Sequence, residues 1–218
     1  MSRRIALIHA HPIAMQPVAD AFARDWPEAD RANILDDALF YDRGKSETLS
    51  KELFDRIVWL AGYARDSGAE GILYSCSAFG EAIEQVQRTY AMPVLKPNEA
   101  MFEAALAHGD RVGMLATAGF AAEGLAQEFR QLAEARGRKA DIATHVVADA
   151  MDALTRGETD THNALIAADA HHLADCDVIM LAHFSTSRAA DAVAAKVNRP
   201  VLTAPGAAVA KLKTALGA

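Results

Sequence analysis

Cysteine is scarce in this chain of 218 residues, which contains only Cys76 and Cys176. The two lie 100 positions apart (176 − 76) and form neither a CxxC pair nor a spacing typical of zinc ligands. This usage favours a cytoplasmic protein, in which thiols stay reduced and remain available for chemistry.

A net excess of positive charge and long apolar runs are also lacking. The net charge is −7, and no basic run offers a track for phosphates, so we expect no nucleic-acid partner. Local donors must therefore hold any anionic substrate, because the overall field of the protein does not attract it. The apolar stretch between Arg4 and His9 is too short for the core of a signal peptide, and no later run is long enough to span a membrane.

What remains is ordinary for a globular protein, with 51% hydrophobic and 23% charged residues. Short apolar runs alternate with helical patterns, which predicts parallel sheets with helices on both faces. The predicted strands are 5–8, 33–35, 71–75, 93–95, 111–115, 142–147, 178–181 and 200–202. The predicted helices are 17–26, 47–67, 81–90, one through Met101 and Leu106, 123–136, 162–174, 188–197 and 207–216, with 38–45 as a loop.

The pattern of strands restarts near the middle of the chain. One offset of 107 positions (200 − 93) relates three pairs of strand segments: 92–95 and 199–202, 71–73 and 178–180, and 5–8 and 112–115. Three pairs at one offset and in the same order indicate a duplicated half. The middle strands do not hold the offset, so the repeat is clearer at the ends of each half.

The same offset pairs Cys76 with His183. Both residues follow an apolar strand, at the edge where parallel sheets bind ligands. If the halves face each other about a pseudo-two-fold axis, the two side chains approach one cleft from opposite sides. That arrangement suits inversion of a carbon centre, in which one group removes a proton and the other returns one on the opposite face.

Backbone amides beyond these two residues are expected to hold a carboxylate, because amides at helix starts are free and favour anions. They would also stabilise enolate-like charge, and we expect them to lower the pKa of Cys76. The candidate substrate-binding residues are His9, Ser75, Ser77, Ala78, Thr117, Ala118, Phe184 and Ser185.

Four segments carry a likeness to a known family: 73–80 (LYSCSAFG), 92–100 (MPVLKPNEA), 113–117 (GMLAT) and 182–185 (AHFS). They resemble the aspartate/glutamate racemase superfamily, and the likeness covers nearly the whole chain. This superfamily includes amino-acid and hydantoin racemases, maleate isomerases and arylmalonate decarboxylases. Its members typically use two cysteines and no cofactor. Cys76 matches the first cysteine position, whereas His183 stands at the second, which departs from the family pattern.

The resemblance implies an α/β fold of two pseudo-symmetric doubly wound lobes, residues 1–98 plus 206–218 and residues 99–205, with an interlobe active-site cleft. The expected protein is a cytoplasmic homo-oligomer without metal or cofactor. It acts as a racemase or isomerase at the carbon next to the carboxylate of a small molecule, with Cys76 as acid/base and His183 opposite. A single-cysteine decarboxylase or cis-trans isomerase of the same superfamily is the alternative, in which His183 only orients Cys76 or a ligand.

Two other classes of function remain open. His9 and His11 are two positions apart, and on one strand they would share a face, as in some metal-dependent hydrolases. His183 could add a ligand to that pair, but no acidic residue ends a strand near Thr117 or Cys76. A binding-only protein would instead hold its ligand tightly without turnover or solvent exchange. Cys176 precedes a strand and is interpreted as a structural thiol.

Overall fold

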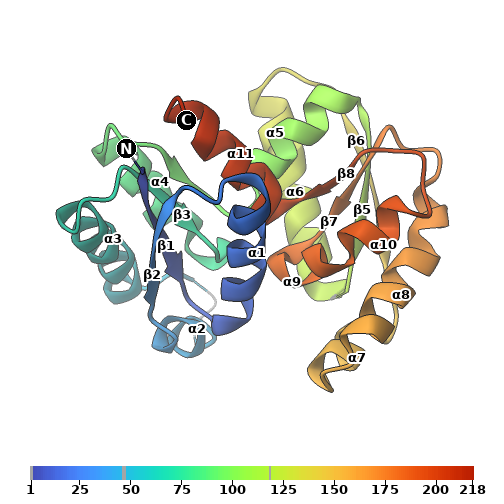
Figure 1. Cartoon of the computed structure of the whole chain (residues 1–218), viewed down its shortest axis with the longest axis horizontal. Coiled ribbons are helices and arrows are strands. Elements are labelled where there is room, and N and C mark those ends of the chain that lie inside the picture. The colour runs from blue at the N-terminus through green and yellow to red at the C-terminus, as the bar shows by residue number, and fades with distance from the viewer. Residues whose placement is uncertain (1, 46–47, 118) are drawn as a thin grey trace. The chain divides into compact units, whose positions relative to one another are not determined.

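The computed structural model describes residues 2–45, 48–117 and 119–218, and the chain divides into two compact units. The first unit consists of Met1–Ala100 with Ala208–Ala218, and the second unit is Met101–Ala207. Each unit is built on a four-stranded parallel sheet with helices packed against it (Figure 1). The predicted α/β class with two parallel sheets is therefore confirmed.

The sheet of the first unit has the strand order β2-β1-β3-β4. Its strands are β1 (Arg4–His9), β2 (Asp30–Leu35), β3 (Gly71–Tyr74) and β4 (Val94–Leu95). The helices that begin in this unit are α1 (Met15–Asp25), α2 (Ala38–Arg43), α3 (Lys51–Asp66), α4 (Gly80–Thr89) and α5 (Glu99–His108). The two central strands, β1 and β3, are buried along almost their full length, as expected for a parallel sheet covered on both faces.

Helix α3 shows how the sequence builds this core. Its buried side chains recur at helical spacing and face the sheet: Leu53, Ile57, Leu60, Ala61 and Ala64. The hydroxyl of Ser50 accepts a hydrogen bond from the Leu53 amide at 3.4 Å and caps the helix. The helix therefore begins at Lys51, later than the predicted start at Glu47, which lies outside the described residues.

The second unit repeats the plan with the strand order β6-β5-β7-β8. Its strands are β5 (Arg111–Ala116), β6 (Asp141–Val146), β7 (Val178–Leu181) and β8 (Val201–Thr203). The helices that begin in it are α6 (Gly119–Ala135), α7 (Ala150–Thr155), α8 (Thr159–Asp169), α9 (His183–Thr186), α10 (Ala190–Ala194) and α11 (Ala204–Ala215).

The duplicated half is visible in the strand positions and in their pairing. β5 begins 107 residues after β1 (111 − 4), and β7 begins 107 after β3 (178 − 71). β6 begins 111 residues after β2 (141 − 30), so the middle strand loses the offset, as expected. The registers also agree, since Ile5 lies opposite Gly71 and Val112 lies opposite Val178.

Helices α5 and α11 each cross the boundary between the units. α5 begins in the first unit and continues into the second, whereas α11 begins in the second unit and ends in the first. The last turns of α11 are fastened to the first unit, because Leu212 lies beside Gly71 and Lys213 Nζ donates to the Asp25 carbonyl at 3.1 Å. The first unit is therefore assembled from both ends of the chain.

Four local expectations are wrong. The segment 38–45, expected as a loop, contains helix α2, which forms around the fully buried Leu39. Within the predicted helix 162–174, α8 ends at Asp169, and the 3₁₀ turn Ala170–Leu173 follows it. The predicted helix 188–197 is interrupted, with a 3₁₀ turn preceding α10. Helix α7 was not expected, and single turns of this kind carry too little periodicity to be recognised.

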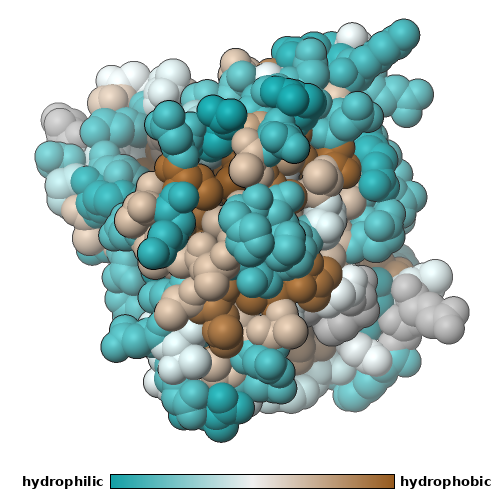
Figure 2. Space-filling view, turned by 90° about the vertical axis from the view of Figure 1, so that its right-hand side faces the viewer, coloured by the Kyte–Doolittle hydropathy of each residue, from teal (hydrophilic) through white to brown (hydrophobic). Residues whose placement is uncertain are grey.

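The surface of the second unit exposes both apolar and hydrophilic side chains. Figure 2 faces the side that carries α8 and α10, and it shows exposed apolar residues within a hydrophilic surround. A hollow of about 660 Å³ lies there, lined mainly by alanines of the two helices and the residue after α10: Ala164, Ala167, Ala168, Ala192 and Ala195. Small side chains leave this space because they do not fill the gap between the helices. No helix in the described ranges has the length and apolarity that a membrane crossing requires.

Gly109 is the glycine most constrained by its surroundings. A Cβ at this position would lie 2.4 Å from Oδ2 of Asp177, the oxygen that accepts a hydrogen bond from the Arg111 amide at 3.0 Å. We expect Gly109→Ala to lower the free energy of unfolding by about 1–3 kcal/mol, measured as a shift of the urea midpoint. The matched control is Gly124→Ala in α6, which has no neighbour within 4 Å and should stabilise the helix by about 0.5–1 kcal/mol. Equal effects of the two substitutions would contradict this explanation.

Candidate active site

Cys76 and His183 occupy equivalent places in the two units. Cys76 lies two residues beyond Tyr74, the end of β3, and His183 lies two residues beyond Leu181, the end of β7. Both strands are fully buried and have a partner on each side. A rigid central strand therefore positions each side chain at the carboxyl edge of its sheet, where parallel sheets bind ligands.

Cys76 is half-buried and begins the 3₁₀ turn Ser77–Phe79 from an extended backbone. Burial raises the pKa of the Cys76 thiol, while a hydrogen bond from the Ala78 amide and the charge of Arg43 lower it by less. The expectation that the amides would depress this pKa is therefore wrong in its net direction, because desolvation is the larger effect. At neutral pH the residue is a protonated thiol and hence a proton donor.

Helix α2 covers the thiol and forms one side of a cavity of about 400 Å³. The cavity is lined by Phe40, Tyr41, Arg43, Gly44, Lys45, Cys76, Ala78 and Phe79. It combines aromatic rings with cationic side chains, so it can accept an acid that carries an apolar substituent. Two of these rings remain exposed, Phe40 at 50% and Tyr41 at 65%, which leaves the cavity open to solvent.

Two contacts hold α2 over Cys76. Arg43 Nε donates to the Ala78 carbonyl at 3.1 Å, and Arg56 of α3 pairs with Asp42 at 3.3 Å. Because the sequence pattern predicted a loop over 38–45, it did not predict that helix α2 forms this side of the cavity. The run Tyr41-Asp42-Arg43, in which aromatic and charged residues adjoin, was the signal available for finding it.

His9 supports the same edge of the sheet from inside. It is fully buried, with Nδ1 2.9 Å from Ser75 Oγ and Nε2 3.1 Å from Asn33 Oδ1. The amide oxygen of Asn33 can only accept, so Nε2 carries the proton and Nδ1 accepts from the Ser75 hydroxyl. This network ties together the ends of β1, β2 and β3 directly behind Cys76.

His11 does not share a strand face with His9, which corrects the premise of the metal-hydrolase hypothesis. β1 ends at His9, and His11 instead caps the 3₁₀ turn Pro12–Ala14, where its Nδ1 accepts from the Ile13 amide at 3.1 Å. Its ring packs edge-on against Phe40. In the part of the chain that the structure describes, neither histidine belongs to a group of three or more potential metal ligands.

The buried His9 makes stability depend on pH. Burial lowers its pKa below the ordinary value of 6.5, so below that value the unfolded chain binds a proton that the folded chain resists. The stability that the neutral, buried His9 contributes is fully present above pH 6.5. It is lost as the pH falls below that value, by up to about 1.4 kcal/mol of unfolding free energy per pH unit for one proton. We expect urea midpoints measured from pH 7.5 to 5 to fall less steeply in His9→Gln than in the wild type. An unchanged slope would contradict this role.

His183 has a backbone conformation that is unusual for a residue with a side chain. Its φ is 67°, in the left-handed region, where histidine is more common than most residues but still strained, at about 1–3 kcal/mol. The Thr186 hydroxyl holds the turn by donating to the His183 carbonyl at 2.9 Å. Strain of this kind gathers at functional positions, although Asp149 also has a positive φ, of 59°.

The His183 ring is poised to accept a proton. Burial lowers its pKa, so the ring is neutral at pH 7. Its Nε2 is buried and has no hydrogen-bond partner among the described residues. A buried nitrogen left unpaired costs stability unless a ligand uses it. Thr117 Oγ1, at the end of β5, is likewise buried and unpaired within the described ranges.

The remaining candidate residues divide by exposure. Phe184 and Ser185 are buried, each with 6% of its surface exposed. Ser77 and Ala78 are exposed, and Ala118 lies outside the described residues. The amides after Cys76 and His183 open a three-residue 3₁₀ turn and the four-residue helix α9. Elements this short supply free amides but only a small helix dipole, which corrects the expectation of full helix starts.

Comparisons with known proteins identify the family and the fold. A family model described as Asp/Glu/Hydantoin racemase matches residues 23–210. Curated protein sequences give no significant match. An aspartate racemase homologue from Pyrococcus horikoshii OT3 is 14% identical, with a TM-score of 0.74 and 100% of both chains covered.

Two further solved structures share the fold. An allantoin racemase from Klebsiella pneumoniae is 17% identical, with a TM-score of 0.71 and coverage of 99% of this chain and 88% of that chain. An arylmalonate decarboxylase is 19% identical, with a TM-score of 0.69 and coverage of 98% and 92%. At such identities the likeness establishes the fold and leaves the reaction to be argued from the site.

Proposed function

Because the chain belongs to the Asp/Glu/hydantoin racemase family, we propose that it is a cofactor-independent racemase or isomerase acting at the carbon next to a carboxylate. The observation that carries this proposal is the pair of acid/base groups at equivalent strand ends, Cys76 after β3 and His183 after β7. Inversion needs two groups that serve opposite faces of one carbon.

The protonation states assign the roles. Burial raises the pKa of Cys76 and lowers that of His183, so the resting pair is a thiol and a neutral imidazole. Nε2 of His183 takes the α-proton, and the electron pair of the broken C–H bond passes into an enolate. Cys76 then gives its Sγ proton to the opposite face and becomes a thiolate. When the opposite enantiomer binds, the Cys76 thiolate removes its α-proton and the protonated His183 returns one to the other face, which restores the thiol and the neutral imidazole.

The cavity beside Cys76 supports a substrate class. Its walls are aromatic, and Arg43 contributes positive charge that favours a carboxylate despite the net charge of −7, whereas the charge of Lys45 is paired with Asp42 at 2.8 Å. We therefore propose small carboxylic acids with an apolar substituent at the reacting carbon. The Thr117 hydroxyl and the backbone amides of Phe184 and Ser185 are proposed to bind polar atoms of the same substrate.

A decarboxylase is the second candidate, and the protonated state of Cys76 specifically favours it. In this reaction the bond to one carboxylate of a malonate breaks, CO₂ leaves, and the enolate takes the Sγ proton of Cys76. Solvent then returns a proton to the thiolate. Only one proton donor is needed, which accommodates a histidine at position 183. The fold shared with an arylmalonate decarboxylase adds weight to this candidate.

Both candidates are tested by incubating the protein in deuterated water with amino acids, hydantoins, dicarboxylates and aryl-substituted malonates. Proton NMR should show exchange at the α-carbon together with inversion for a racemase. Release of CO₂ with deuterium in the product identifies the decarboxylase. Ligand-induced shifts without exchange or turnover would support the binding-only alternative and overturn the enzymatic proposal.

A further inference from the structure

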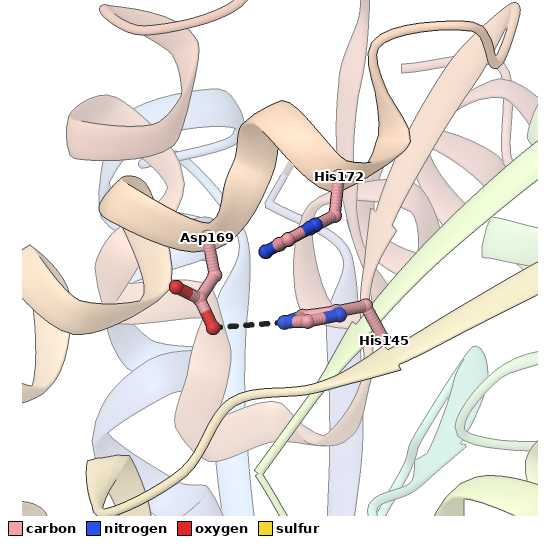
Figure 3. Close-up of side chains that lie close together, drawn as sticks. All are labelled: His145, Asp169 and His172. Atoms are coloured by element: carbon pink, nitrogen blue, oxygen red, sulfur yellow. Dashed lines mark hydrogen bonds and ion pairs between the residues drawn. The ribbon is translucent and has the colours of Figure 1, made fainter.

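The second unit gathers metal-binding side chains that the proposed reaction does not use. His145 of β6, Asp169 at the end of α8 and His172 of the 3₁₀ turn Ala170–Leu173 point toward one another (Figure 3). One ligand atom from each lies within 4.8 Å of the other two. We propose that these three side chains bind a divalent transition-metal ion of the zinc type, which fastens β6 to the chain segment leading into β7.

The cluster is largely organised before an ion binds. His145 Nε2 donates to Asp169 Oδ2 at 2.8 Å, and the rings of His145 and His172 are stacked with centroids 4.3 Å apart. The ring of His171 packs near His172, with centroids 4.0 Å apart, and its Nδ1 donates to the Ala168 carbonyl at 2.7 Å. The hydrogen bond positions His145 and Asp169, so little freedom of these two side chains is lost on binding, whereas the exposed His172 has to be ordered.

The distances require only a small adjustment. Two ligands of a tetrahedral zinc ion, each about 2.1 Å from the metal, stand about 3.4 Å apart. His145 and Asp169 are slightly closer than this, at 2.8 Å, and the exposed His172 moves inward by rotation of its side chain. The ion replaces the proton that His145 donates to Asp169, and that proton passes to solvent.

The donor atoms select the kind of ion. Two imidazoles with one carboxylate suit zinc and its neighbours among the divalent transition metals, whereas magnesium and calcium prefer oxygen ligands alone. Three protein ligands leave a fourth position for water. Asp169 and His172 are three residues apart, but His145 lies 24 residues before Asp169, which explains why the sequence spacing, read with the expectation of no metal, did not reveal the site.

A bound ion would raise the stability of the second unit, because its ligands lie on neighbouring elements of that unit. β6 is an edge strand of its sheet, and the turn Ala170–Leu173 leads into β7, the strand that ends before His183. Leu173 of that turn packs against the backbone of β5 at Gly113. A metal bridge between β6 and the turn therefore holds together three neighbouring parts of the second unit.

The test is titration of the full chain, first treated with chelator, with Zn²⁺ in a calorimeter. We expect one ion to bind and the melting temperature to rise, because the ion binds the folded state only. His145→Gln, Asp169→Asn and His172→Gln should each weaken binding by at least about tenfold and abolish the thermal shift. Cobalt(II) as a second probe should give the visible absorption of a tetrahedral site, and Mg²⁺ should give neither signal.

The matched control is His108→Ala, which removes an exposed histidine of the same unit that lies outside the cluster and should leave Zn²⁺ binding unchanged. The proposal is overturned if the wild-type chain binds no Zn²⁺, or if the three variants bind it as tightly as the control. Circular dichroism of each metal-free variant separates loss of the ligand from loss of the fold. Neither result depends on the catalytic proposal, because metal binding is measured without substrate.

Discussion

Cys76→Ser lowers inversion of configuration by about 10²–10⁴-fold, the range typical of a lost general acid or base. A serine hydroxyl occupies nearly the same space as the thiol, but its pKa is too high for it to donate and regain a proton in the way that Cys76 does. The measurement is chiral chromatography of the product, with the wild type and the variant at equal concentration. The same substitution removes CO₂ release if the protein is a decarboxylase.

Cys176→Ala is the matched control for this experiment. Cys176 lies within the core of the second unit, with 7% of its surface exposed, and its sulfur lies beside Gly113. Its removal should reduce stability while leaving inversion near the wild-type rate. Full inversion in Cys76→Ser would refute the assignment of Cys76, and loss of inversion in both variants would point to a general effect on folding.

His183→Asn abolishes inversion of configuration and leaves only slow exchange on the face that Cys76 serves, because only the thiolate form of Cys76 can remove a proton and burial raises the pKa of the thiol. Asparagine adopts the left-handed backbone readily, so the φ of 67° at this position is preserved while the base is lost. In deuterated water, one enantiomer should acquire deuterium without being converted into the other, because one group can remove and return a proton on its own side. Chiral chromatography with mass detection measures both quantities in one sample.

Retention of full inversion by His183→Asn would make the two-base mechanism wrong. Cys76 acting alone, as in a decarboxylase or a covalent isomerase, would then replace it. The pH profile gives a separate measure, because burial lowers the pKa of His183. The base form is present above that pKa, so the wild-type rate for the direction that begins with His183 should hold down to below pH 6.5 and then fall. The variant should lack this decline.

The duplicated strands and the strand-end positions of Cys76 and His183 could be predicted, because both follow from short-range signals. Apolar runs reveal β1, β3, β5 and β7, and one offset of 107 residues relates their halves (111 − 4 and 178 − 71). The position of each candidate group then follows from the general geometry of parallel sheets. Neither step needs knowledge of which side chains meet in space.

What could not be predicted depends on contacts between distant segments. Burial of Leu39 stabilises α2, and α2 in turn covers Cys76, so the sign of the Cys76 pKa shift depends on packing that no local pattern reveals. The left-handed φ of His183 was also not predicted, because the apolar pattern of a strand does not indicate the backbone conformation of the residue that follows it. Sequence periodicity reports which face of an element is apolar, but not the solvent that its neighbours exclude.

The chain path of α11 determines the order in which the protein can be completed during synthesis. Residues 101–207 form the whole second unit, so a ribosome delivers that unit in one continuous piece. The first unit, although translated earlier, waits for Leu212 and Lys213 to reach Gly71 and Asp25. The usual order, in which the N-terminal part folds first during translation, is thus reversed for the final step. A nascent chain that has emerged from the ribosome as far as residue 207 contains every residue of the second unit, whereas its first unit still lacks residues 208–218.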